Sequence, residues 1–129
     1  MNYQSLLSKL SSVSKGEVIA IDGPSGSGKT TLANQLKSDL PAVEIIHVDD
    51  LYQGWQDAFT ERLSTSIINK ILIPISKKIE FDYEIYDWKK DNFYKSNRIS
   101  VDKIYILDGV GSGQSSFRPY LSRVIWLNI

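Results

Sequence analysis

The octapeptide at residues 23–30 restricts the fold of this chain more than any other feature, and it reads GPSGSGKT. It fits the pattern G-x-x-x-x-G-K-[ST] at every fixed position. A loop that wraps a phosphate turns several backbone N–H groups inward, and glycines are needed where side chains would block that approach. The lysine places a positive charge beside the phosphate oxygens, and the threonine hydroxyl can bind Mg²⁺. The octapeptide therefore predicts a site for a nucleoside triphosphate.

The neighbouring segments support this interpretation over its alternative, a glycine-rich turn that matches by accident. Residues 17–22 form an apolar run typical of a buried strand, and Leu32, Leu36 and Leu40 recur at the spacing of one helix face within residues 31–40. Strand, loop and helix thus occur in the order that the motif requires. We expect ATP to be held by the loop and the start of the helix, through Gly23, Ser25, Gly26, Ser27, Gly28, Lys29, Thr30 and Thr31.

The composition is that of an ordinary globular domain and argues against several classes of partner. The chain has 129 residues, of which 42% are hydrophobic and 23% charged, and this suits a single domain. Its 15 basic residues balance 15 acidic ones, so we expect no binding to nucleic acid or to an anionic membrane. Cysteine is absent and His47 is the single histidine, which excludes disulfides and zinc sites built from thiolates or histidines. Magnesium held by oxygen ligands is the metal to expect.

The first residues argue against export and membrane insertion. Residues 1–14 lack the basic start and apolar core of a signal peptide, and no apolar stretch reaches the length that spans a bilayer. We therefore expect a cytoplasmic protein. Leu6, Leu7, Leu10 and Val13 give residues 1–15 a helical stripe, which we expect to pack on the domain.

Alternating strand and helix patterns continue along the chain. We expect strands at residues 43–48, 103–108 and 123–129, each of them rich in β-branched or aromatic side chains. Residues 77–97 are rich in charge and aromatic rings without a clean period, and we expect them to be irregular or briefly extended. Residues 56–76 predict a long amphipathic helix that Pro74 can break, with an apolar face of Phe59, Leu63, Ile67, Ile71 and Ile75.

Short apolar runs separated by helical segments indicate a parallel sheet with helices on both faces. We therefore predict a three-layer α/β fold of the P-loop NTPase type, formed by one domain over residues 1–129. Residues 1–15 are its N-terminal helix and residues 17–129 its nucleotide-binding core. Ligands of such sheets bind at the carboxyl ends of the strands, where residues 23–30, Asp49, Asp50 and Asp108 are expected to lie.

The three aspartates at strand ends are candidates for chemistry. Asp108 closes a hydrophobic strand downstream of the phosphate loop, where an acid can hold Mg²⁺ directly or through water; the alternative is an ordinary acidic turn residue. Of Asp49 and Asp50, one can orient the hydroxyl that attacks the γ-phosphate, and the other can cap the next helix. The pattern alone leaves open which of the two has which role.

The combination of four segments resembles the uridine kinase group of P-loop kinases, in particular its small bacterial members. These segments are GPSGSGKT at residues 23–30, VDDLY at 48–52, YDW at 86–88 and LDGV at 107–110. The resemblance implies a kinase that uses ATP and Mg²⁺, in which Lys29 serves catalysis, and Thr30 and Asp108 hold the metal. It assigns Asp49 to the acceptor hydroxyl, and it assigns the acceptor pocket to Tyr52, Tyr86 and Trp88, whose alternative role is core packing.

The chain departs from the family pattern at three places. The family has glutamate where this chain has Asp108, and a histidine near the segment that here contains Lys89, Lys90 and Asp91. Family members also continue into an arginine-bearing lid helix and a last strand, so we expect a C-terminally incomplete domain. Because residues 123–129 then form a buried strand with nothing to cover it, we expect self-association or a partner at that strand.

Three functions remain open at this point. The leading hypothesis is transfer of the ATP γ-phosphate to a hydroxyl of a nucleoside or similar small acceptor. The alternatives are a catalytically impaired ATP-binding module and a P-loop NTPase without a small-molecule acceptor.

Overall fold

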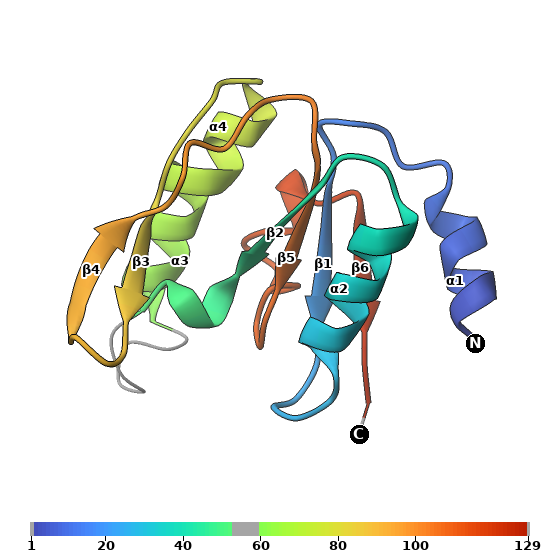
Figure 1. Ribbon diagram of the computed structural model, residues 1–129, viewed down its shortest axis with the longest axis horizontal. Helices are drawn as coiled ribbons and strands as arrows, with labels where there is room; N and C mark the ends of the chain where they lie inside the picture. The colour runs from blue at the N-terminus through green and yellow to red at the C-terminus, as the bar shows by residue number, and fades with distance from the viewer. Residues whose placement is uncertain (1, 53–59, 129) are drawn as a thin grey trace.

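A four-stranded parallel sheet forms the centre of the structure, a computed structural model that describes residues 2–52 and 60–128 (Figure 1). Its strand order is β2 (Val43–His47), β5 (Ile104–Asp108), β1 (Val18–Asp22) and β6 (Arg123–Trp126). Every residue of β1 and β5 is buried, as expected of strands that are covered on both faces. The carboxyl ends of these strands lie along one edge of the sheet, at the bottom of Figure 1.

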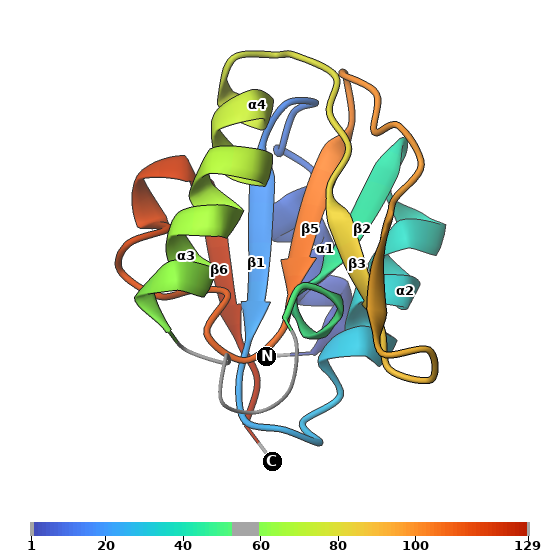
Figure 2. The same ribbon diagram turned by 90° about the vertical axis from the view of Figure 1, so that its left-hand side faces the viewer.

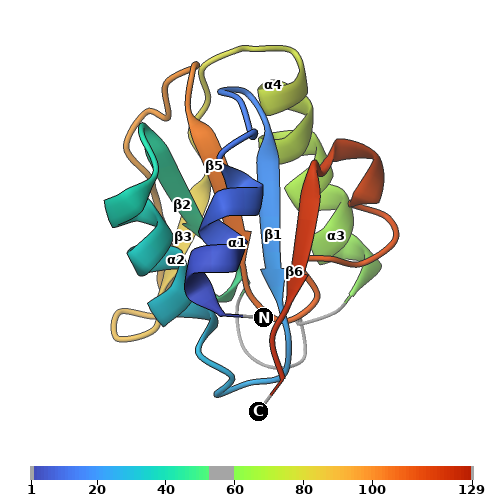
Figure 3. The same ribbon diagram turned by 90° about the vertical axis from the view of Figure 1, so that its right-hand side faces the viewer.

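Helices cover both faces of the sheet, so the predicted three-layer α/β fold is confirmed. Helices α1 (Tyr3–Leu10) and α2 (Lys29–Asp39) lie on one face, toward the viewer in Figure 3. The segment α3 (Glu61–Ile67), η3 (Ile68–Leu72) and α4 (Ile73–Ser76) lies on the other, toward the viewer in Figure 2. Each face has its own apolar core, formed around Leu36 on the first side and around Ile71 on the second.

The N-terminal segment packs on the domain as expected, although its helix is shorter than residues 1–15. The side chain of Asn2 caps α1 by accepting a hydrogen bond from the Ser5 amide. Leu10 is buried against the first core, and the Tyr3 hydroxyl donates to Asp39 of α2 over 2.5 Å. The helix therefore belongs to the outer layer on the α2 side. Among the described residues, none of the helices is both long and apolar enough to cross a bilayer.

The expected long helix is present from residue 61 to residue 76, and Pro74 does not end it. Proline has no amide hydrogen and its ring collides with the preceding turn of a regular α-helix. Here the turn before Pro74 is the π-helical η3, whose wider spacing gives that ring room and lets the Ile73 amide donate to Ile68. The predicted apolar side chains at 63, 67, 71 and 75 are buried, whereas Phe59 lies outside the described residues.

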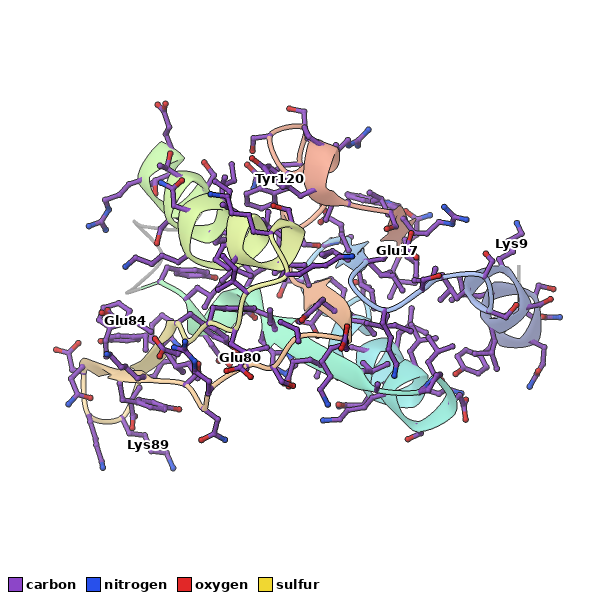
Figure 4. All side chains as sticks on the ribbon, turned by 90° about the horizontal axis from the view of Figure 1, so that it is seen from above. Lys9, Glu17, Glu80, Glu84, Lys89 and Tyr120 are labelled. Carbon is purple, nitrogen blue, oxygen red and sulfur yellow. The ribbon has the colours of Figure 1, made fainter. Side chains whose placement is uncertain are left out.

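Residues 77–97 are more regular than we expected, because they contain an antiparallel hairpin of β3 (Glu84–Asp87) and β4 (Asn92–Lys95). Asp87 forms the turn, since its carboxylate accepts hydrogen bonds from the amides of Lys89 and Lys90 at 2.9 and 3.1 Å. The hairpin carries Glu84 and Lys89 at the far end of the molecule from Lys9 of α1 (Figure 4). Aromatic side chains occur on both faces of the hairpin, so the sequence shows no two-residue alternation of apolar and polar residues there.

The last strand differs from the prediction of a buried strand. β6 pairs in parallel with β1 at the edge of the sheet, and the side chains of Val124 and Trp126 are 41% and 59% exposed. Ile125, which lies between them, packs against the first core, so Val124 and Trp126 point to the opposite face of this edge strand. Self-association through this strand stays a prediction.

Candidate functional site

The phosphate loop joins β1 to α2 and leaves the start of that helix open to an anion. Gly26 and Gly28 have φ values of 79° and 94°, and Gly28 is the N-cap of α2 without a side-chain cap. The first amides of an α-helix have no partners within the helix, and they carry the positive end of its dipole. The Lys29 ammonium donates to the Pro24 carbonyl at 2.7 Å, which holds it against its own loop. Backbone and lysine thus provide the cradle that the motif predicts.

A buried carboxylate fixes the entry to this loop. Asp22, the last residue of β1, is 6% exposed. It accepts hydrogen bonds from the amides of Gly23, Gly111 and Gly113 at 2.7, 2.9 and 2.9 Å. The last two belong to the loop after β5, so Asp22 ties that loop to the phosphate loop. Its role is to position the backbone, and the sequence analysis assigned it none.

Asp49 and Asp50 lie on the short 3-10 turn η1 (Val48–Asp50), which follows β2. Asp49 is exposed and accepts a hydrogen bond from the Tyr52 hydroxyl at 3.3 Å. Asp50 is half-buried, and burial raises its pKa above the ordinary value. The expectation that one of the two caps the next helix is wrong for the described residues, because Thr60 caps α3.

Asp108 and His47 are the last residues of neighbouring strands and are direct partners in the β2–β5 register. The His47 Nδ1 atom lies 3.0 Å from Asp108 Oδ1. This hydrogen bond raises the pKa of His47, although burial opposes the effect. Asp108 is 4% exposed, and its second oxygen, Oδ2, has no hydrogen-bond partner among the described residues. A buried carboxylate oxygen without a donor is a fitting ligand for a cation.

One cavity of about 280 Å³ brings most of the predicted site residues together. The phosphate loop, η1 and the end of β5 all contribute to its wall. Gly23 and Ser27 of the predicted set lie outside the lining, as do Tyr86 and Trp88. The predicted residues that line the cavity are Ser25, Gly26, Gly28, Lys29, Thr30, Thr31, Asp49, Tyr52 and Asp108.

Aromatic rings connect this cavity to the hairpin. The Trp88 ring contacts Tyr52 edge-on at a centroid distance of 6.4 Å and Tyr86 at 5.0 Å. Tyr86 also contacts Phe93 at 5.1 Å, and its hydroxyl donates to Asp91. Tyr52 and Tyr86 are buried, whereas Trp88 is 51% exposed. The three aromatic residues expected at the acceptor site therefore form one cluster, to which the structure adds Phe93.

A second cavity, of about 340 Å³, lies between α3, η3 and the hairpin. Its wall is apolar along Leu63, Ile67 and Ile71, and it carries Tyr83 and Phe93 on the opposite side. Charged side chains also line it, two of them basic and one acidic, namely Arg62, Lys70 and Glu84. A small cavity shares Leu63 and Ile67 with this one and Tyr52 and Val110 with the phosphate cavity. The two larger hollows are therefore neighbours.

Glycine is required at position 109 for a reason that the sequence analysis missed. Gly109 follows Asp108 with a φ of 149°, and a Cβ atom there would lie 2.6 Å from Cβ of Val48. Real Cβ contacts do not approach so closely, so Gly109 allows the turn that carries Asp49 to pack against the end of β5. Its only signal in the sequence was its place directly after the strand-end acid.

Comparisons with known proteins agree with this geometry. The uridine-cytidine kinase C of Dictyostelium discoideum is 24% identical over 112 residues, which are 81% of this chain and 25% of the relative. A possible uridine kinase from Bacillus stearothermophilus has a similar structure, with a TM-score of 0.81 and 22% identity over 95% of this chain and 77% of that one. A family model described as ABC transporter matches residues 9–101. The chain belongs to the P-loop nucleotide-binding proteins that this family model describes, and it is similar to the two kinases named above.

The three comparisons support different statements about the chain. The structural likeness confirms the fold, and the family model spans the phosphate loop and α2 that P-loop proteins share. The matched part of the chain corresponds to a quarter of the length of the curated relative. The activity and substrate of the whole relative therefore reach this chain only as a proposal.

Proposed function

We propose that this uridine kinase-like chain transfers the γ-phosphoryl group of ATP to a hydroxyl of a nucleoside or similar small acceptor, with Mg²⁺ bound. The observation that carries the proposal is the shared cavity, because Lys29, Thr30, Asp49 and Asp108 all line it. Transfer needs a cradle for the phosphates, a metal site and a group that orients the attacking oxygen. Each of these has a candidate residue in that one wall.

The donor set fits Mg²⁺ and nucleotide. Thr30 would provide a hydroxyl and Asp108 its partnerless Oδ2 atom, both oxygen ligands of the kind that Mg²⁺ prefers. No group of three His, Cys, Asp or Glu side chains in the described residues suits a metal ion, so phosphate oxygens would complete the coordination. When bound, Mg²⁺ neutralises charge that develops on the transferred group. Lys29 and the α2 amides would bind the phosphates.

Asp49 would orient the acceptor hydroxyl and accept its proton. It lines the cavity, whereas Asp50 does not, and it lies on the turn next to the aromatic cluster. Tyr52 lines the cavity, and the exposed Trp88 ring contacts Tyr52 and Tyr86, so a planar acceptor can pack against this cluster. The second cavity is large enough for such a ring. Phe93 belongs both to its lining and to the aromatic cluster, so the two are adjacent. The aromatic cluster beside the cavity favours a small-molecule acceptor over water as the group that receives the phosphoryl group.

The test is ADP formation with and without a panel of nucleosides. Acceptor-dependent ADP supports the kinase, acceptor-independent phosphate release supports a P-loop NTPase, and ATP binding without turnover supports a binding module. The Asp49→Asn variant should lower single-turnover transfer by about 100-fold or more, since general base catalysis contributes about 10²–10⁴-fold. Its affinity for ATP should stay near that of the wild type.

Two further variants serve as controls. Asp50→Asn makes the same chemical change one residue away, outside the cavity wall, and should have a much smaller effect on transfer. Lys29→Ala should weaken ATP binding itself, because its ammonium is the charge expected to face the phosphates. If Asp50→Asn abolishes transfer while Asp49→Asn does not, the assignment of the base is wrong.

A further inference from the structure

We propose that His47 is a positioning residue that holds Asp108 in the orientation required to bind the metal. The inference rests on the proposed function only in taking Asp108 as the metal-binding acid. His47 is the last residue of β2, whose other side chains are apolar apart from one glutamate. Its ring is the one side-chain partner that the structure gives to Asp108 among the described residues.

The register of the sheet creates this pair. His47 ends β2 and Asp108 ends β5, and the two residues are paired across the parallel ladder. Nδ1 of the ring lies 3.0 Å from Oδ1, while the Asp108 side chain is 5% and the His47 side chain 36% exposed. An ionised carboxylate only accepts hydrogen bonds, so Nδ1 carries the hydrogen in this contact. The imidazole is thus partly exposed, whereas the carboxylate that it contacts is buried.

The hydrogen bond from His47 uses one oxygen of the Asp108 carboxylate and leaves the other free to bind the metal. Oδ1 is held by the imidazole, and Oδ2 is buried without a partner, on the residue that lines the phosphate cavity. Aspartate has a short side chain with few rotamers, and one strong hydrogen bond is enough to fix its plane. Partners that orient a ligating carboxylate typically change metal affinity by about 10- to 100-fold when they are removed. His47 meets that description through geometry alone.

Three substitutions separate a positioning role from simple packing. In His47→Asn the amide nitrogen stands as many bonds from Cβ as Nδ1 does, so it can donate to Oδ1 from the same place. In His47→Gln the amide lies one bond further out. In His47→Phe the ring volume remains but the donor is lost. Metal binding should therefore follow the position of the donor and not the size of the side chain.

The measurement is Mn²⁺ binding to the intact chain in the presence of ADP, followed by electron paramagnetic resonance, with ADP binding in EDTA as the metal-free reference. We expect His47→Phe and His47→Gln to weaken Mn²⁺ binding by about 10- to 100-fold, and His47→Asn to stay within about threefold of the wild type. Affinity for metal-free ADP should be the same in all three. Asp108→Asn, which removes the ligand itself, gives the lower limit of the metal signal.

The outcomes distinguish this inference from the proposed function. Equal Mn²⁺ binding by the wild type and His47→Phe overturns the inference, as does a His47→Asn variant that loses as much affinity as His47→Gln. Parallel losses of thermal stability and metal-free ADP affinity would indicate packing, and also overturn it. A wild-type chain whose Mn²⁺ binding with ADP depends on His47, but which phosphorylates no acceptor, refutes the kinase alone. A wild-type chain without Mn²⁺ binding refutes both.

Discussion

The carboxylate of Asp22 should stabilise the fold more than any exposed acid, and Asp22→Asn tests this with a change of one atom. The substitution keeps an acceptor for the amides of Gly23 and Gly111, which both donate to Oδ1. It places an amide group opposite the Gly113 N–H, which now donates to Oδ2 at 2.9 Å. A hydrogen bond to a charged group contributes about 1.5–3 kcal/mol, and a buried donor left unpaired costs about 1–3 kcal/mol.

These two effects overlap, because both describe the same lost bond, and relief of carboxylate burial offsets part of them. We therefore expect the free energy of unfolding to fall by about 1–3 kcal/mol in urea denaturation, with an unchanged slope. Asp102→Asn is the matched control, since it removes the same charge from an exposed residue whose φ of 63° suits asparagine. It should change stability by less than about 0.5 kcal/mol. Equal midpoints for both variants would refute the role given to Asp22.

Two further predictions concern packing and pH. Gly109→Ala should lower the free energy of unfolding by about 1–3 kcal/mol more than Gly16→Ala, because both glycines have positive φ but only the Cβ at 109 would meet Val48; equal losses in urea denaturation would contradict this. Burial raises the pKa of Tyr83 from its ordinary value of 10.0 to about 12, so the unfolded chain ionises first and stability should fall between pH 10 and about pH 12. Urea midpoints at pH 9 and pH 11 should differ less in Tyr83→Phe than in the wild type, and an identical pH response in both would show that Tyr83 makes no contribution.

The layers of the fold followed from the sequence because strand and helix periods were strong. The apolar run at residues 17–22 fits a buried strand, and the four-residue spacing from Leu63 to Ile75 fits one face of a helix. Both predictions were confirmed. The hairpin at residues 84–95 was missed, since Tyr86 and Phe93 form a cross-strand pair that exists only once the turn at Asp87 is made. A break at Pro74 stayed open as a possibility, because the local pattern does not reveal the π-helical turn before it.

The residues of the candidate site also fall into those that the sequence could predict and those that it could not. The phosphate loop carries its geometry in consecutive residues, so its positions could be named in advance. Asp49 was placed by resemblance, and the structure puts it in the same cavity wall as Lys29. His47 and Asp22 gave no signal, because their partners lie 61 and 89–91 residues away and depend on the strand register. Neither a sequence motif nor hydrophobic periodicity can predict a residue whose role is to contact backbone or side chains far away in the sequence.

The position of β1 at the centre of the sheet also governs when the phosphate site can form during synthesis. β1 emerges early, but its two neighbours are β5 and β6, which pair Val18 with Tyr105 and Ile19 with Arg123. A nascent chain must therefore keep a largely apolar strand unpaired until residues 104–126 have left the ribosome, and non-local pairing of this kind folds slowly. Nucleotide cannot assist the early steps, because the loop that binds it is anchored by amides of residues 111 and 113. Strand order thus sets the stage of synthesis at which nucleotide can begin to stabilise the chain.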